Sequence, residues 1–278
     1  MKNKSSIITL IVVLSILAIG VIGLLVMLLT NNIRFHGLFS NINFSTSKTI
    51  IHDEYYENRY NLIDINNSLG DIYLFNSEDE RIHVVVYGEE DMLSIEDNES
   101  LNIKYKGKSC FGFCFNYEAA KIEVYIPTDY DKKIKVENSA GNIKVNDFPS
   151  AILDIDSDLG DTNIGNIKEL NIVSDAGDIE VDSVNRIKAE NNLGDIKIDK
   201  VTEYLDIEDD CGDIKIKNID IKESSRITNN MGDIKIGQTN DIRIESKVSL
   251  GEEKVNDSNS KSDIVLDIKN SCGDIEVN

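Results

Sequence analysis

The feature of this sequence that most constrains its fold is a repeat centred on glycine. The segment Asn-Asn-Leu-Gly-Asp-Ile-Lys-Ile at residues 191–198 has close copies every 17 to 22 residues from residue 141 to the C-terminus. A period near 20 residues indicates a solenoid or a similar repeat array. An earlier copy, at Gly70, stands apart from the series. The glycines of the series are Gly141, Gly160, Gly177, Gly194, Gly212, Gly232, Gly251 and Gly273.

Hydrophobic residues alternate around each glycine. The second residue after the glycine is Ile in seven of nine copies, and the fourth is Ile, Leu or Val in every copy. This period of two indicates a half-buried strand. A second apolar pair lies upstream, as at Leu170 and Ile172, and a single apolar residue follows, as at Val184. The pattern predicts an all-β parallel β-solenoid, β-helix-like, with one coil per repeat and coils about 4.8 Å apart.

The residue before each glycine is apolar in every copy, and in two copies it is cysteine. We interpret Cys211 and Cys272 as small core residues in place of Leu or Ala. They are expected three coils apart, about 14 Å, which exceeds disulfide reach. Cys110 and Cys114 instead flank a short aromatic loop and are predicted to form a disulfide outside the membrane.

Residues 50–136 have a different sequence pattern from the repeats that follow. Segments 82–87, 101–105 and 121–126 alternate like strands but lack the Gly-Asp turn. We predict a partly antiparallel β cap, including the first repeat, which closes the membrane-proximal end of a solenoid at residues 137–278. The other end is predicted to be uncapped, so its edge at 271–277 could accept a strand and allow end-to-end self-association.

The N-terminal region predicts a membrane anchor. Residues 7–30 are 24 residues without a charge, and about 20 suffice to span a bilayer as a helix. Lys2 and Lys4 precede this span, which places residues 1–6 in the cytoplasm. The sequence therefore predicts a single-pass protein of the cell membrane, with a tether at 31–49 and an extracytoplasmic C-terminal domain.

The charge of the chain limits its partners. The formal net charge is -21 at pH 7. Such a surface repels nucleic acid and anionic lipid, and attracts cations or basic partners.

The repeat also resembles a known family. The run 122–126 before Pro127, the stretch 134–143 and the serial Gly-Asp-Ile turns are similar to the "putative adhesin" family of bacterial envelope proteins. That family is related to the toastrack domains of envelope-stress proteins. The resemblance covers residues 50–278 and implies a β-helix-like fold and a surface location, and its motifs carry no catalytic signature.

An acid follows the glycine in eight copies, and Asn142 takes its place in the ninth. Stacked coils would align these acids in a ladder, joined by Asp158, Asp175, Asp209 or Asp210 from the same turn. Calcium could bridge such oxygens, and the candidate ligands are Asp161, Asp178, Asp195, Asp213 and Asp233. Alternatively, each Asp caps its own turn by accepting backbone N–H groups, a role that Asn142 could also fill. The remaining acids of the ladder are Asp71, Glu252 and Asp274.

A column of outward lysines is predicted beside this ladder. In the copies from Gly177 to Gly273, the residue between the two inward apolar positions is Lys in four and Glu180 or Glu276 in the other two. One interpretation is contact with an anionic envelope polymer, and the other is an ordinary solvated sheet face. The lysines are Lys197, Lys215, Lys235 and Lys254.

The sequence offers little for catalysis. Its only histidines are His36, His52 and His83, and none has a nucleophile or metal partner by motif. We therefore expect a non-enzymatic binding or adhesion module of the cell envelope, with an envelope polymer or protein as partner. No cofactor is expected, and calcium is the one candidate ion, through the acid ladder. The alternative is an envelope-stress sensor or regulator that contacts a membrane protein through its cap and the aromatic loop at 111–117.

Overall fold

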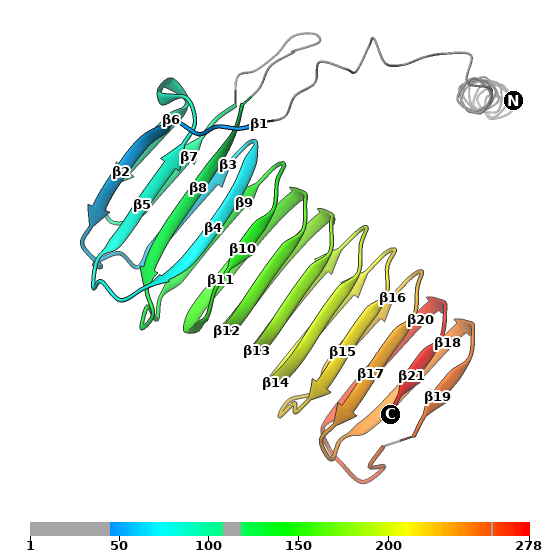
Figure 1. The fold of residues 1–278 in the computed structure, drawn as a ribbon. Helices are drawn as coiled ribbons and strands as arrows, with labels where there is room; N and C mark the ends of the chain where they lie inside the picture. Colours follow the sequence, from blue (N-terminus) through cyan, green and yellow to red (C-terminus); the bar gives the residue numbers. More distant parts are fainter. Residues whose placement is uncertain (1–44, 108–117, 257) are drawn as a thin grey trace, which may run out of the picture. The chain divides into compact units, whose positions relative to one another are not determined.

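A computed structural model of the chain describes residues 45–107, 118–256 and 258–278. These residues form β-strands wound into a stack of coils (Figure 1). The predicted anchor at 7–30, almost all of the tether, and Cys110 and Cys114 lie outside the described residues. Within the described ranges, no helix is long and apolar enough to cross a membrane. The helical element there is the single 3-10 turn η2 (Glu90–Met92).

The strands form two layers that enclose the core, and strands β12, β13 and β14 bend from the first layer into the second. In spatial order, the first layer contains β2 (Ile50–Tyr56), β5 (Ile82–Tyr87), β8 (Glu118–Pro127), β4 (Gly70–Ser77), β10 (Ile143–Val145), the first parts of β12 (Thr162–Ala176), β13 (Ile179–Asn191) and β14 (Ile196–Asp209), then β15 (Ile214–Ile219), β17 (Ile234–Thr239), β21 (Ile275–Val277) and β19 (Glu253–Val255). A short strand β1 (Ser45–Thr46) pairs with β8.

The second layer follows the same direction through the stack. It contains β6 (Leu93–Asp97), β7 (Leu101–Tyr105), β3 (Leu62–Asn67), β9 (Lys133–Asn138), β11 (Phe148–Leu159), the second parts of β12, β13 and β14, then β16 (Ser225–Asn229), β20 (Val265–Cys272) and β18 (Arg243–Leu250).

Parallel pairing in register builds the core from ladders of like residues. In the first layer Ile179, Ile196, Ile214 and Ile234 stand directly above one another, and all four are fully buried. This confirms the predicted parallel β-solenoid. The predicted antiparallel cap is also confirmed, because β2 pairs antiparallel with β5, β5 with β8, and β6 with β7.

The order of the coils departs from chain order at both ends of the stack. At the cap end, the β3–β4 coil lies between the β7–β8 coil and the β9–β10 coil. Gly70 N–H donates to Ala140 O at 2.7 Å. The copy at Gly70 therefore stacks directly on the main series, where the sequence suggested that it stands apart.

At the far end, the β20–β21 coil lies between the β16–β17 coil and the β18–β19 coil (Figure 1). Gly232 N–H donates to Cys272 O at 2.9 Å, and Gly273 N–H donates to Leu250 O at 2.8 Å. The prediction of an open edge at 271–277 is therefore wrong, because β21 is paired on both sides. The outermost coil is β18–β19.

The connection that permits this inversion is the loop between β19 and β20. Its Ser258 Oγ accepts a hydrogen bond from Ile244 N–H at 3.0 Å, and Asn259 N–H donates to Ile242 O at 2.7 Å. The loop therefore lies against the start of β18, and the chain steps back by one coil, from the β18–β19 coil to the β20–β21 coil. Because of the inversion, Cys211 and Cys272 are two coils apart rather than three, about 10 Å at the coil spacing, and both are free.

Candidate functional surface at the glycine turns

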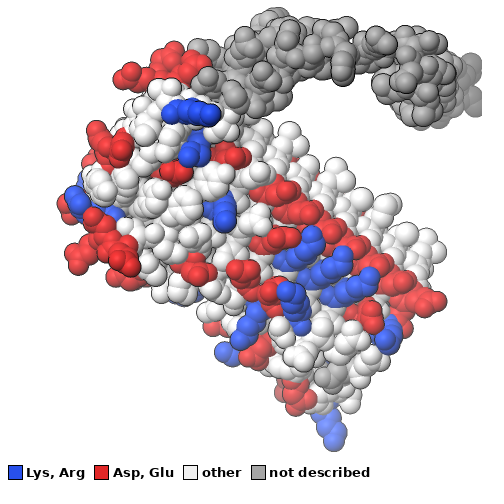
Figure 2. All heavy atoms as spheres, in the orientation of Figure 1, with Lys and Arg blue, Asp and Glu red and all other residues white. Residues whose placement is uncertain are grey.

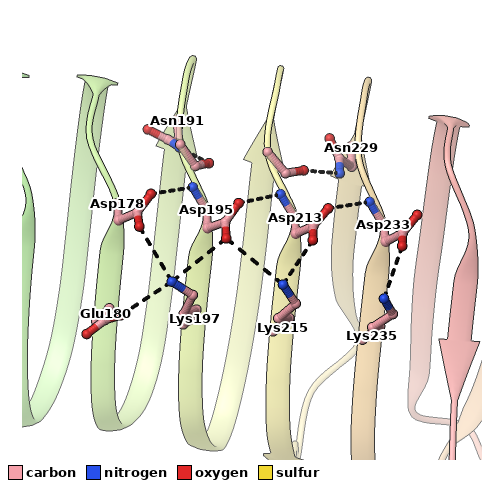
Figure 3. Close-up of polar contacts among 12 residues, drawn as sticks. Asp178, Glu180, Asn191, Asp195, Lys197, Asp213, Lys215, Asn229, Asp233 and Lys235 are labelled. Carbon is pink, nitrogen blue, oxygen red and sulfur yellow. Dashed lines mark hydrogen bonds and ion pairs between the residues drawn. The ribbon is translucent and has the colours of Figure 1, made fainter.

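The acids that follow the glycines form a continuous hydrogen-bonded ladder along the stack. Asp178 Oδ1 accepts Asp195 N–H at 2.9 Å, and Asp195 Oδ1 accepts Asp213 N–H at 3.0 Å (Figure 3). The same contact joins every step from Asp71 through Asn142 to Glu252, at 2.8–3.0 Å. Each side chain therefore caps the backbone of the next coil, and not its own turn as the turn-cap alternative predicted.

The second carboxylate oxygens of this ladder face the lysines. Lys215 Nζ lies 2.9 Å from Asp213 Oδ2, and Lys235 Nζ lies 3.0 Å from Asp233 Oδ2. Lys197 Nζ bridges three carboxylates, at 3.5 Å from Asp178, 3.4 Å from Glu180 and 3.8 Å from Asp195. Figure 2 shows the result, a line of acidic side chains along the stack with a group of basic side chains beside it.

The predicted column of four lysines is interrupted. Glu276 lies between Lys235 and Lys254, because β21 is inserted between their strands. Lys254 Nζ lies 3.0 Å from Glu276 Oε1. All four ammonium groups therefore have carboxylate partners, and this arrangement favours the solvated-face interpretation over a free basic stripe.

The hydrogen bonds of the ladder stabilise its charged form. The N–H of Asp233, and then Lys215, hold the pKa of the Asp213 carboxyl below its usual value. The N–H of Asp274, and then Lys235, have the same effect on the pKa of Asp233. Backbone amides and ammonium groups thus supply the positive partners that a calcium ion would otherwise provide. Among the described residues, no group of three or more His, Cys, Asp or Glu side chains is placed to hold a metal ion.

A second ladder, which the sequence interpretation missed, lies inside the turn three residues before each glycine. Its side chains are small and polar in every described coil of the series but one, where Val248 takes the position. Asn191 Nδ2 donates to Gly194 O at 2.8 Å, and Asn229 Nδ2 donates to Gly212 O at the same distance. The repeated polar residue at one fixed offset was a signal for this role. The buried members are Asn67, Asn138, Ser157, Ser174, Asn191, Asp209, Asn229 and Asn270.

Asp209 is the single acid in this internal ladder. The sequence suggested that it joins the surface carboxylates, but its residue is only 2% exposed. Its Oδ1 accepts Asn191 Nδ2 at 3.3 Å, and its Oδ2 has no hydrogen-bond partner in the structure. Burial raises the pKa of Asp209 to about 6. Hydrogen bonds donated by Asn191 and by Cys211 N–H lower this pKa and so offset part of the rise.

The apolar residue before each glycine points outward, so the interpretation of these positions as core is wrong. Leu159, Leu193 and Met231 are 55–57% exposed, and Leu250 is 70% exposed. Cys272 is exposed and Cys211 is half-buried. Strand alternation counted from the upstream pair would direct this residue inward. The chain is already turning there, and the side chain leaves the core at the corner.

The sequence profile of the Toastrack DUF4097 family matches residues 60–278. This chain belongs to the Toastrack family. The resemblance inferred from the Gly-Asp-Ile turns is thereby confirmed. No curated protein matches the Toastrack chain significantly.

Solved structures also match the Toastrack chain, at low identity. A "putative lipid binding protein" from Parabacteroides distasonis is 16% identical, with a TM-score of 0.48 over 84% of this chain and 99% of that chain. A "putative adhesin" from Bacteroides fragilis is 15% identical, with a TM-score of 0.35 over 82% and 100%. A "putative cell adhesion protein" from Clostridium sporogenes is 12% identical, with a TM-score of 0.29 over 81% and 97%. The family assignment therefore depends on the profile match alone.

The described histidines of the Toastrack chain belong to the cap. His83 Nε2 lies 2.7 Å from Asp53 Oδ1, and its ring stacks on Tyr55 at 4.1 Å between centroids. His52 Nε2 lies 3.0 Å from Tyr56 Oη. Within the described ranges, neither histidine contacts a serine or cysteine that could serve as a nucleophile. These contacts fit a structural role in covering the sheet face.

We expect millimolar calcium to leave the melting temperature of the chain unchanged. In Asp178, Asp195, Asp213 and Asp233 both carboxylate oxygens are already engaged, by N–H groups and by lysines, so an ion would have to displace them. Differential scanning calorimetry with calcium and with a chelator checks this. A saturable rise in melting temperature with calcium would restore the predicted site at Asp161, Asp178, Asp195, Asp213 and Asp233.

Replacing Asp195 separates its capping role from its charge. Asp195→Ala removes the acceptor for Asp213 N–H and is expected to cost about 1 kcal/mol of unfolding free energy. Asp195→Asn should cost less than about half of that, because Asn142 accepts Asp161 N–H at 3.0 Å in the equivalent place. Denaturant unfolding of the two variants measures the difference. Equal losses of unfolding free energy in the two variants would show that this position stabilises the fold through its charge and not through the capping hydrogen bond.

Proposed function

We propose that this Toastrack chain is a membrane-anchored, extracytoplasmic binding module of the cell envelope without enzymatic activity. The observation that supports the proposal is that the repeated features of the described residues have structural roles. The glycines, the acid ladder and the buried polar ladder all maintain the turns, and the strands maintain the core. What remains for function is a set of long, repeating outer surfaces, which suit contact with an extended partner rather than turnover of a small substrate.

The proposed anchor is the uncharged segment at 7–30, with Lys2 and Lys4 on its cytoplasmic side. The domain would then lie outside the membrane. The net charge of the whole chain is -21, and like charge keeps such a domain away from anionic headgroups.

A protein is the better supported partner. An anionic envelope polymer would need free cations, and the lysines of the predicted column are all paired with carboxylates. The regulatory alternative depends on the loop at 111–117, which lies outside the described residues. It stays a prediction from the sequence.

Fractionation of cells that express the full chain with a C-terminal tag tests the proposed placement. The chain should sediment with membranes and become soluble when residues 1–30 are deleted, and external protease should remove the tag from intact protoplasts. A tag protected from protease would place the domain inside the cell and contradict the proposal. Chemical cross-linking on the same cells should then join the tagged chain to protein, with the same products from Lys215→Glu and Lys235→Glu variants.

A further inference from the structure

An apolar ridge runs along one corner of the coil stack. It consists of the residues that directly precede the glycines. The N–H of every one of these glycines except Gly251, in the outermost coil, donates to the carbonyl of the ridge residue in the next coil at 2.7–3.0 Å. Those hydrogen bonds fix the spatial order of the ridge. From the cap outward it reads Leu69, Ala140, Leu159, Ala176, Leu193, Cys211, Met231, Cys272 and Leu250.

Large and small side chains alternate strictly along this ridge. Leu159, for example, stands between Ala140 and Ala176. The alternation exists only in the spatial order. In chain order Met231 and Leu250 would be neighbours, and the inserted β20–β21 coil places Cys272 between them. At the coil spacing, a large side chain therefore projects about every 10 Å, with a gap between each pair.

Among the residues that the structure describes, no contact accounts for this pattern. The turn accepts Leu, Met, Ala and Cys at the same position, so its geometry does not require a large residue. The four large side chains beyond Leu69 are all more than half exposed. Exposed apolar side chains arranged in a continuous line, with polar residues on both sides, are typical of an interaction surface.

The polar residues beside the ridge restrict what can cover it. One border is the acid ladder, and uncharged side chains lie directly along it in Figure 2. The other border is the position two residues before each glycine, which is Asp at 158, 175 and 210 and a hydroxyl or amide in the other copies. No lysine or arginine occupies either border, so an anionic polymer or an anionic lipid surface has no favourable contact there.

We propose that the ridge of one chain packs against the ridge of a second copy, with the large side chains of each inserted into the gaps of the other. Two identical ridges share the same repeat and are self-complementary, as a two-fold interface requires. In an extended peptide the side chains on one face repeat about every 6.8 Å, so their spacing does not match the spacing of about 10 Å between large side chains of the ridge. The interface is independent of the proposed function, since it needs neither the anchor nor an envelope partner.

The net charge sets the salt dependence of this pairing. Two chains that each carry -21 repel one another, and salt shortens the range of that repulsion from about 10 Å at 0.1 M to about 3 Å at 1 M. The apolar contact itself is not weakened by salt. Association should therefore strengthen as the salt concentration rises, whereas an interface held by ion pairs would weaken.

Sedimentation velocity of the full chain in zwitterionic lipid nanodiscs tests the proposal, over a concentration series at low and high salt. Wild type should dimerise, more tightly at high salt. The variant Leu159→Ser, Leu193→Ser, Met231→Ser should lose at least about tenfold in association with an unchanged melting temperature. The matched control is Ile50→Ser, on a residue of β2 in the cap that is 52% exposed and not part of the ridge, and it should dimerise like wild type.

A variant that fills the gaps distinguishes interdigitation from nonspecific apolar association. Ala140→Leu with Ala176→Leu adds apolar surface but removes two gaps, so it should weaken dimerisation by at least about tenfold. Stronger association of this variant would overturn the proposal, since it would show a nonspecific apolar patch. A monomeric wild type at all salt concentrations, or equal association of wild type and the serine variant, would also overturn it.

Discussion

Replacing Gly194 with alanine is expected to destabilise the domain by about 3–5 kcal/mol. A Cβ at Gly194 would lie 2.2 Å from Gly177 O and 2.6 Å from its carbonyl carbon, and the residue has a φ of +129°, which L side chains rarely adopt. The obstacle is backbone of the adjacent coil. That coil is fixed by the bond from Gly177 N–H to Leu193 O at 2.9 Å, so it cannot yield without losing its own pairing.

Guanidinium unfolding followed by circular dichroism measures this loss. The matched control is Gly107→Ala, because a Cβ at Gly107 would meet only Ser68 Cβ, at an ordinary 3.6 Å. The control should stay within about 0.5 kcal/mol of wild type. A Gly194→Ala variant that loses less than about 1 kcal/mol would mean that the coils are not stacked as closely as the structure shows.

Replacing Asp209 with asparagine is expected to stabilise the domain by roughly 2–3 kcal/mol at pH 7.5. The pKa of Asp209 is raised from 3.8 to about 6 in the folded state, so the folded chain binds the proton more tightly than the unfolded chain. Its carboxyl therefore favours folding below pH 4, and this contribution is lost as the pH rises through 6. At neutral pH a buried charge remains, with one oxygen unpaired.

The neighbours of Asp209 can accept the amide. Asn138 holds the equivalent position in another coil, where it accepts Asn67 Nδ2 at 3.0 Å and donates its own Nδ2 to Gly141 O at 2.8 Å. The difference between Asp209→Asn and wild type should be near zero at pH 4 and grow up to pH 7.5. Asp241→Asn, on an exposed residue, is the control and should show no such trend. A constant difference across this pH range would refute the assignment of the titration to Asp209.

Much of the fold follows from local pattern. Alternation at Ile196 and Ile198 predicts the strand, the recurring glycine predicts the turn, and the loss of that turn in segments 82–87 and 101–105 predicts the antiparallel cap. Each of these features depends on residues a few positions apart, which a single sequence displays. Capping by the acids was one of two predicted alternatives, but within each Asp's own turn, and the hydrogen bond to the next coil was not predicted.

The features that the sequence interpretation missed depend on how coils are placed in space. Every coil presents the same apolar pattern to its neighbours, so nothing local indicates that β21 lies between β17 and β19. The errors at the 271–277 edge and in the lysine column both follow from that inversion. The outward direction of Leu193 was missed because the turn breaks the alternation that the strands obey. Asp209 obeys that alternation after Leu205 and Ile207, and its inward direction was missed because an acid was assigned to the surface.

The most direct test of this account is the order of the last coils, on which the ridge alternation depends. Two cysteine pairs, placed in a background without the four native cysteines, distinguish the possible orders. Lys235 and Glu276 are register partners on adjacent strands, about 4.8 Å apart, so Lys235→Cys with Glu276→Cys should form a disulfide. Lys235→Cys with Lys254→Cys should not, because their strands are separated by β21 and lie about 10 Å apart. The reverse result, a bridge between 235 and 254 but not between 235 and 276, would show coils stacked in chain order and contradict the account.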